Sequence, residues 1–221
     1  MFRIDPDRAD RALPRHCSDL IHARLKQQTA IAHQRVERAF DLPSSTLTTS
    51  TYVSALLKMS LAYDGLRREL DRCLGSDSDA VKEVTTRIEW LRGDLRSFGI
   101  GEMSLPILPF VLDDADEALG CEYVMRGSAL GGLIIFKLAA DRLQVTEHRG
   151  GRFFYGYGPS TKVRWSAFLD RLSQSKTAAS DSDQLVRGAI KSFEHFERAL
   201  STGIAPQRKS MEARETEGNC Q

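Results

Sequence analysis

The stretch ALGCEYVMRGSALGGLIIFKL, residues 118–138, decides the fold. Its apolar residues recur at the three- and four-residue spacing of one helical face, and Asp113 and Asp114 before it favour a helix start. Three glycines within six residues interrupt this pattern: Gly127, Gly131 and Gly132. Each costs about 1 kcal/mol of helix propensity relative to alanine, roughly 3 kcal/mol in all. We therefore expect a long, interrupted helix whose glycines serve a purpose that offsets this loss.

The rest of the chain shows the same helical periodicity, and no segment alternates with the period of two that marks a strand. Further helices are predicted for residues 18–42, 51–74, 78–98, 165–172 and 185–200. Pro106 and Pro109 hold residues 105–112 out of regular helix, and residues 150–159 form a glycine-rich aromatic loop. The sequence therefore predicts an all-α protein of six or seven helices.

Composition limits the possible partners. The 221 residues suit one domain, with a flexible segment at 1–17, a domain at 18–203 and a polar tail at 204–221. Lys plus Arg number 31 against 30 for Asp plus Glu, so the near-neutral chain offers no general attraction for nucleic acid. Four scattered cysteines without a C-x-x-C pair indicate a reduced, cytoplasmic protein, and no apolar stretch is expected to span a membrane.

Gly127 and Gly131 lie four residues apart and therefore share one face of the predicted helix. Their bare backbone could support a planar ligand, or it could let a second helix approach closely. Judged alone, the two interpretations are about even. The additional Gly132 slightly favours a kinked helix that faces a ligand.

His33 lies at the edge of the apolar stripe of the first predicted helix, on the same flank as Lys26 and Glu37. Taken alone, such a histidine is more often a half-buried residue satisfied by a neighbour. Heme, however, needs one neutral imidazole for its iron and cations near its carboxylates. Lys26, about two turns from His33, would supply such a cation from the same helix.

Three segments together resemble the bacterial biliverdin-producing heme oxygenases, including those encoded beside bacterial phytochromes. They cover about residues 20–200 in the expected order. The segments are Leu25-Lys26-x-x-Thr29-x-x-x-His33-x-x-x-Glu37, Gly127-Ser128-x-Leu130-Gly131-Gly132, and Phe153-Phe154-Tyr155-Gly156-Tyr157-Gly158-Pro159 followed by Trp165 and Phe168.

The resemblance implies a single-domain heme oxygenase-like helical bundle with heme between a proximal and a kinked distal helix. It makes His33 the axial iron ligand, with Glu37 beside it and Lys26 at a heme propionate. The residues expected near the distal face are Gly127, Ser128, Gly131 and Gly132. On the last predicted helix, Phe193 could line the pocket, although aromatic residues at helical spacing more often belong to the core. Tyr52 is expected to help deliver protons through water.

The implied activity is reductive, O2-dependent cleavage of heme to biliverdin, CO and Fe2+, with heme as both substrate and cofactor. Electrons would come from a ferredoxin or a flavoprotein reductase, and the bilin would supply a bacterial phytochrome or the reaction would release iron. Two alternatives stay open on the sequence alone. One is a non-catalytic heme carrier or sensor, and the other is a helical interaction domain that binds no heme.

Overall fold

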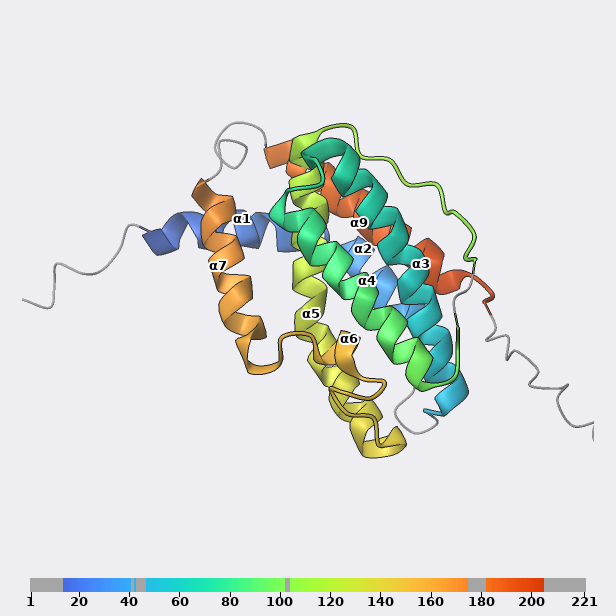
Figure 1. Ribbon diagram of the computed structural model, residues 1–221. Coiled ribbons are helices and arrows are strands. Elements are labelled where there is room, and N and C mark those ends of the chain that lie inside the picture. Colours follow the sequence, from blue (N-terminus) through green and yellow to red (C-terminus); the bar gives the residue numbers. More distant parts are fainter. Residues whose placement is uncertain (1–13, 41, 43–46, 102–103, 175–181, 205–221) are drawn as a thin grey trace, which may run out of the picture.

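The computed structural model describes residues 14–40, 42, 47–101, 104–174 and 182–204. Within these ranges the regular elements are all helices, as expected, and the only bridges are isolated ones in the turn at 146–150. The helices labelled in Figure 1 are α1 (Pro14–Gln28), α2 (Ala30–Ala39), α3 (Thr49–Leu74), α4 (Asp79–Ser97), α5 (Ala115–Leu143), α6 (Arg152–Tyr155), α7 (Thr161–Gln174) and α9 (Ser182–Ser201). A short 3-10 helix, η2 (Gly158–Ser160), precedes α7.

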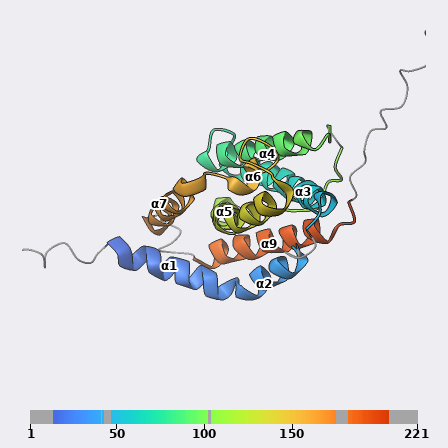
Figure 2. The ribbon, with the colours of Figure 1, turned by 90° about the horizontal axis from the view of Figure 1, so that it is seen from below.

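The helices pack around α5 and α9. Figure 2 shows α1 and α2 running end to end along one side of the molecule, with α9 between them and α5. The antiparallel pair α3 and α4 lies on the opposite side, while α7 packs against α1 and α5. Apolar side chains from nearly all these helices form one continuous core. The described helices therefore share one core.

The backbones of α5 and α9 touch at a pair of glycines. A Cβ atom on Gly120 would lie 2.1 Å from the Leu185 carbonyl oxygen, and one on Gly188 would lie 2.0 Å from the Glu117 carbonyl oxygen. Real Cβ atoms do not approach other atoms so closely, so neither position accepts a side chain. The close helix crossing that the sequence allowed at Gly127 and Gly131 is thus found two turns earlier, at Gly120.

The first predicted helix is two helices. α1 begins at Pro14, earlier than expected, and it passes into α2 through a turn at Thr29. The Thr29 hydroxyl donates to the Leu25 carbonyl at 2.7 Å, and backbone bonds continue on both sides of the turn. A threonine that bonds back to the preceding turn bends a helix without ending it, which explains the division.

Three helices begin at side-chain caps, and the caps of α4 and α5 lie where the sequence predicts these helices to start. At the start of α3, Thr48 and Thr51 form a capping box. At α4 the Ser78 hydroxyl accepts a hydrogen bond from the Val81 amide, and at α5 the Asp114 carboxylate accepts hydrogen bonds from two backbone amides. Each cap satisfies donors that the first helical turn leaves free. The predicted connector at residues 105–112 is confirmed as irregular chain.

Two expectations about the centre of the chain are wrong. The interruption expected at the glycines is absent, because α5 is helical throughout and extends to Leu143. The segment at 150–159 is not simply a loop, because it contains α6 and the start of η2. Three predictions fall on residues that the structure does not describe. They are most of the predicted flexible start (residues 1–13), the connector before the last helix (175–181) and nearly all of the polar tail (205–221).

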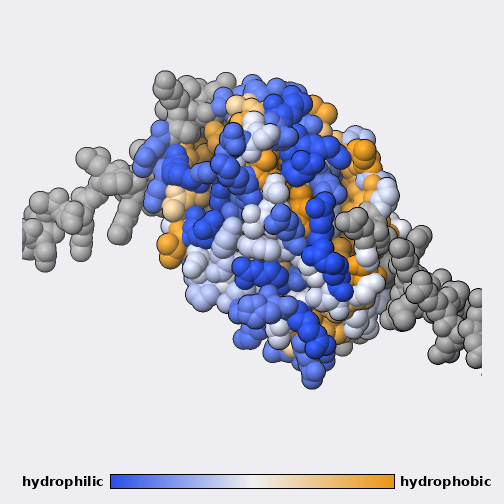
Figure 3. All heavy atoms as spheres, viewed as in Figure 1, coloured by the Kyte–Doolittle hydropathy of each residue, from blue (hydrophilic) through white to orange (hydrophobic). Residues whose placement is uncertain are grey.

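By length and composition alone, α5 would also suit a membrane span, contrary to the expectation that no such stretch exists. α5 packs against α3, α6, α7 and α9, however, which is the position of a central helix in a bundle. Figure 3 shows a mostly hydrophilic face over the side of the molecule that carries α4 and α7.

His195 is a fully buried histidine at the centre of the bundle. It stacks on Phe110 at 4.4 Å between ring centroids, and its Nε2 lies 3.0 Å from the Ala62 carbonyl oxygen. Burial lowers the pKa of His195 to about 4, so the ring is neutral at pH 7 and its Nε2–H donates to Ala62. The absence of a side chain at Gly65 makes room for this ring, since a Cβ there would lie 2.4 Å from Nε2.

We predict that Gly65→Ala lowers the free energy of unfolding by about 1–3 kcal/mol, because the added methyl group pushes His195 off its carbonyl partner. Gly93→Ala is the matched control, since a Cβ there meets only the far end of Arg96, at 4.0 Å. That change should raise stability by about 0.5–1 kcal/mol through helix propensity. Urea denaturation followed by circular dichroism measures both, and equal effects of the two changes would contradict the tight fit at Gly65.

Candidate functional site

His33 is a partly exposed histidine on α2 whose ring is oriented by two neighbours. Its Nδ1 lies 3.5 Å from Glu37 Oε1, one helical turn on, and 53% of its side chain is exposed. The buried Phe193 of α9 meets the ring edge-on at 5.4 Å. With Nδ1 directed at a carboxylate, Nε2 is the nitrogen left for a ligand.

The face of α5 that carries Gly131 is bare. Gly131 is exposed, and a Cβ atom placed on it would have nothing within 4 Å. Ser128 and Ile134 are exposed on the same helix, and Ile134 is one of the most exposed large apolar residues, at 74%. A flat apolar group could therefore reach the main chain of α5 at this point.

The other two glycines of the motif face neighbours. A Cβ on Gly127 would lie 3.4 Å from the Trp165 ring, so α7 covers this position. Gly132 is buried, and a Cβ there would lie 3.0 Å from the Phe154 carbonyl oxygen of α6. Of the three glycines, Gly131 alone has open space in place of its missing side chain.

Trp165 belongs to a cluster of rings between α1, α5 and α7. It packs on Tyr123 at 5.3 Å and on His22 at 5.7 Å, and the Tyr123 hydroxyl lies 3.2 Å from His22 Nδ1. His22 therefore belongs to this cluster and lies apart from the His33 pair. Lys26 is exposed near the end of α1, and no described residue forms an ion pair with it.

A buried polar chain leads to Ser128 from inside the bundle. The Ser128 hydroxyl donates to the Met125 carbonyl at 2.8 Å, and the Tyr63 hydroxyl lies 3.4 Å from Ser128 Oγ. The Ser128 hydroxyl carries one proton, which it donates to the Met125 carbonyl. Tyr63 is therefore the donor in its contact with Ser128. Arg87 in turn donates to the Tyr63 hydroxyl at 3.2 Å.

Glu83 anchors the inner end of this chain. Its carboxylate is buried and accepts hydrogen bonds from Arg87 Nε at 2.8 Å and from the Tyr157 hydroxyl at 2.9 Å. Burial acts to raise the pKa of Glu83, but Arg87, Tyr157 and Arg126 together outweigh it, and the pKa lies below its ordinary value. Glu83 is therefore ionised at pH 7 and holds Arg87 against Tyr63.

Tyr52, which the sequence analysis expects to help deliver protons, lies away from Ser128. Tyr52 is fully buried, and its hydroxyl donates to the Gly150 carbonyl at 2.9 Å, away from Ser128. Tyr63 is the tyrosine that reaches Ser128. Tyr63 is held in place by Arg87 and Glu83, and the only sequence signal for this pair is their spacing of four residues. Such a spacing is common on ordinary helix surfaces.

The all-α arrangement is the heme oxygenase fold. The sequence profile of the heme oxygenase family matches residues 111–202, from the end of the connector to the end of α9. Among solved structures, the NO- and CO-bound heme oxygenase from Neisseria meningitidis aligns with a TM-score of 0.60 and 20% sequence identity, over 81% of this chain and 89% of that chain. No curated protein sequence matches the chain.

The residues present fit a heme. An iron porphyrin that is held by histidine needs a neutral imidazole nitrogen and an apolar surface for its flat ring. His33 offers Nε2 with its other nitrogen directed at Glu37, and Gly131 offers exposed backbone beside the apolar Ile134. The described residues contain no group of three or more His, Cys, Asp or Glu that could hold a bare metal ion.

We predict that Gly131→Ala leaves the protein as stable or slightly more stable, by up to about 1 kcal/mol, because the methyl group enters open space on a helix. Gly132→Ala should lower stability, because its methyl group meets the Phe154 carbonyl oxygen. Thermal denaturation of the two variants separates them. If Gly131→Ala were as damaging as Gly132→Ala, Gly131 would be a packing glycine and not part of a ligand surface.

Proposed function

We propose that the chain is a heme oxygenase that cleaves heme reductively to biliverdin, CO and Fe2+. The proposal depends most on His33, a partly exposed imidazole whose Nδ1 is directed at Glu37 while Phe193 fixes the ring. The fold and the family match over residues 111–202 support it. Bound heme would supply the redox chemistry, with O2 and an external electron donor.

In this proposal His33 Nε2 holds the iron and Glu37 accepts from Nδ1–H. A carboxylate at the second nitrogen fixes the tautomer and strengthens the imidazole as a donor. Lys26, exposed and without an ion-pair partner among the described residues, would attract a propionate of the heme. Phe193 limits rotation of the His33 ring and so holds Nε2 in one direction.

On the distal side, the missing side chain at Gly131 would let the macrocycle approach α5. At Gly127 and Gly132 the same helix packs against α7 and α6. Ser128 is the polar side chain on this face. Its oxygen accepts a hydrogen bond from Tyr63, which Arg87 and Glu83 hold from behind. These residues would keep a hydroxyl oriented beside the distal face, where protons are consumed.

A ferredoxin or a flavoprotein reductase would supply the electrons in the cytoplasm. The bilin product would serve a bacterial phytochrome, or the reaction would release iron for the cell.

Titration of the purified chain with hemin tests the proposal directly. We expect a Soret band at one equivalent and, after a reductant is added in air, its replacement by biliverdin absorption. His33→Ala should weaken hemin binding and reduce turnover by at least about 100-fold, because an iron ligand is lost. His148→Ala is the matched control, since that histidine is 83% exposed and lies elsewhere, in the turn at 146–150.

Three results would contradict the proposal or its iron ligand. A Soret band that persists under reductant and air would identify a heme carrier or sensor instead of an oxygenase. The absence of any Soret band would leave a helical interaction domain. Wild-type turnover by the His33→Ala variant without added imidazole would reject His33 as the ligand.

Tyr63→Phe tests the buried chain. We expect this change to leave hemin affinity within about twofold while slowing turnover by about 10- to 100-fold, because Ser128 loses its donor. The pH titration of the hemin complex by absorption should shift in the same variant. Tyr52→Phe is the control, because its hydroxyl bonds to Gly150. An unchanged titration in Tyr63→Phe would show that Tyr63 has only a packing role.

A further inference from the structure

A separate cavity lies between α4, α5 and α7, with a volume of about 530 Å³. Arg126 is its lining residue on α5, five positions before Gly131. At about 100° per residue, these two residues point about 140° apart around the helix. The cavity therefore opens from a different side of α5 than the proposed heme face, and that volume is within the range of about 300–1,000 Å³ for small-molecule sites.

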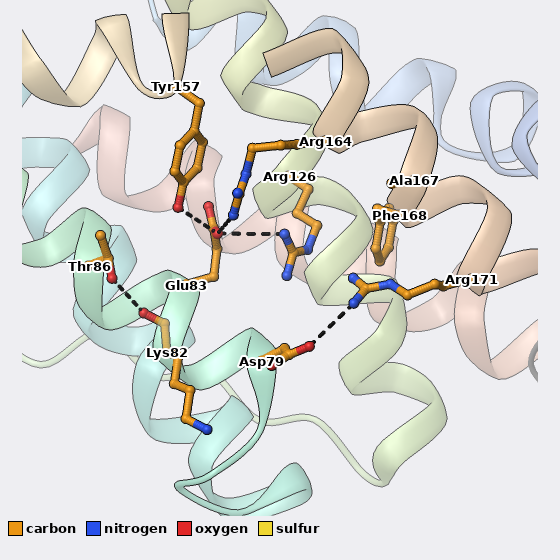
Figure 4. Close-up of a pocket in the computed structure, with 10 residues that line it drawn as sticks. All are labelled: Asp79, Lys82, Glu83, Thr86, Arg126, Tyr157, Arg164, Ala167, Phe168 and Arg171. Carbon is orange, nitrogen blue, oxygen red and sulfur yellow. Dashed lines mark hydrogen bonds and ion pairs between the residues drawn. The ribbon is translucent and has the colours of Figure 1, made fainter. Parts of the chain in front are cut away.

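Figure 4 shows the lining of this cavity. Arg126, Arg164 and Glu83 meet at one end, and Arg171 pairs with Asp79 at the other. Arg126 is nine-tenths buried, with Nε 2.6 Å from Glu122 and Nη1 3.5 Å from Glu83. Arg164 reaches Glu83 at 3.3 Å from one side.

Positive charge exceeds negative charge around the cavity. Four cationic side chains line it, against the two carboxylates of Asp79 and Glu83. Arg87 and Glu122 form ion pairs with residues of the lining and add one charge of each sign. The surplus therefore remains two positive charges. Partly buried positive charges that exceed their carboxylates attract an anion, and a surplus of two suits a dianion.

Several donors are available to such an anion. None of the described residues accepts a hydrogen bond from Arg126 Nη2 or from Lys82 Nζ. Arg164 lies over the Tyr157 ring at 3.7 Å, which holds its guanidinium at the cavity. Guanidinium groups pair with phosphate oxygens through two parallel hydrogen bonds, and a phosphate monoester carries nearly two charges on one group.

The same cavity has an apolar wall. Phe168 and Ala167 line it from α7, and the Arg126 guanidinium lies over the Phe168 ring at 5.4 Å. A bare inorganic anion would leave this wall and most of the volume unused. We propose that the cavity binds a small organic phosphate monoester, with its phosphate at Arg126 and Arg164 and its organic part against Phe168.

Isothermal titration calorimetry of the chain without heme tests this proposal with three probes: glycerol 3-phosphate, inorganic phosphate and succinate. We expect glycerol 3-phosphate to bind most tightly, inorganic phosphate more weakly, and succinate more weakly still. Raising the salt concentration should weaken binding, because part of the attraction is between exposed charges. Equal affinities for all three probes would contradict the proposed phosphate monoester.

Variants then locate the site. Arg164→Gln should weaken glycerol 3-phosphate binding by about tenfold, because it removes one charged donor. Lys162→Gln is the matched control, as an exposed lysine of α7 outside the lining. Circular dichroism confirms that each variant is folded. Absence of binding to the wild type at millimolar concentration, or equal loss in the control, would overturn the proposal.

Discussion

The backbone contact between α5 and α9 at Gly120 and Gly188 is the constraint on which the rest of the structure depends. Each glycine presses against a carbonyl of the other helix, so the crossing has one position along both helices. α9 also packs on α2, and Phe193, five residues after Gly188, contacts His33. The crossing therefore sets where the candidate iron ligand lies relative to the bare face of α5.

Hydrogen bonds and ion pairs of the buried Glu83 connect the two sides of α5. Through Arg87 and Tyr63 this carboxylate reaches Ser128 on the candidate heme face. Through Tyr157, Arg126 and Arg164 it reaches the cavity on the other side. Buried charges are costly unless they are paired and hydrogen-bonded, so this cluster holds α4, α5 and α7 in a defined arrangement. One ionised group thus supports both the proposed heme site and the proposed phosphate site.

The sequence predicts features that depend on local chemistry. The caps at Ser78 and Asp114 and the irregular chain around Pro106 are set by neighbouring residues, and the structure confirms them. Tyr63 and the pairing of Gly120 with Gly188 were missed because these residues meet only after the chain has folded. The bend at Thr29 was missed because a threonine inside a helix carries no distinctive sequence signal.

The glycine motif shows both the strength and the limit of sequence reasoning. The glycines are costly in a helix and drew attention to α5, but periodicity could not tell which glycine faces open space. Gly132 faces the main chain of α6, Gly127 faces Trp165, and Gly131 faces open space. The roles of His33, Lys26 and Glu37 rest on a family resemblance and stay predictions.

A crystal structure of the chain with hemin tests the central claim most directly. We expect the iron to be ligated by Nε2 of His33 and the porphyrin to lie against the main chain of α5 at Gly131. Iron bound by another side chain, or a porphyrin located away from α2 and α5, would contradict it.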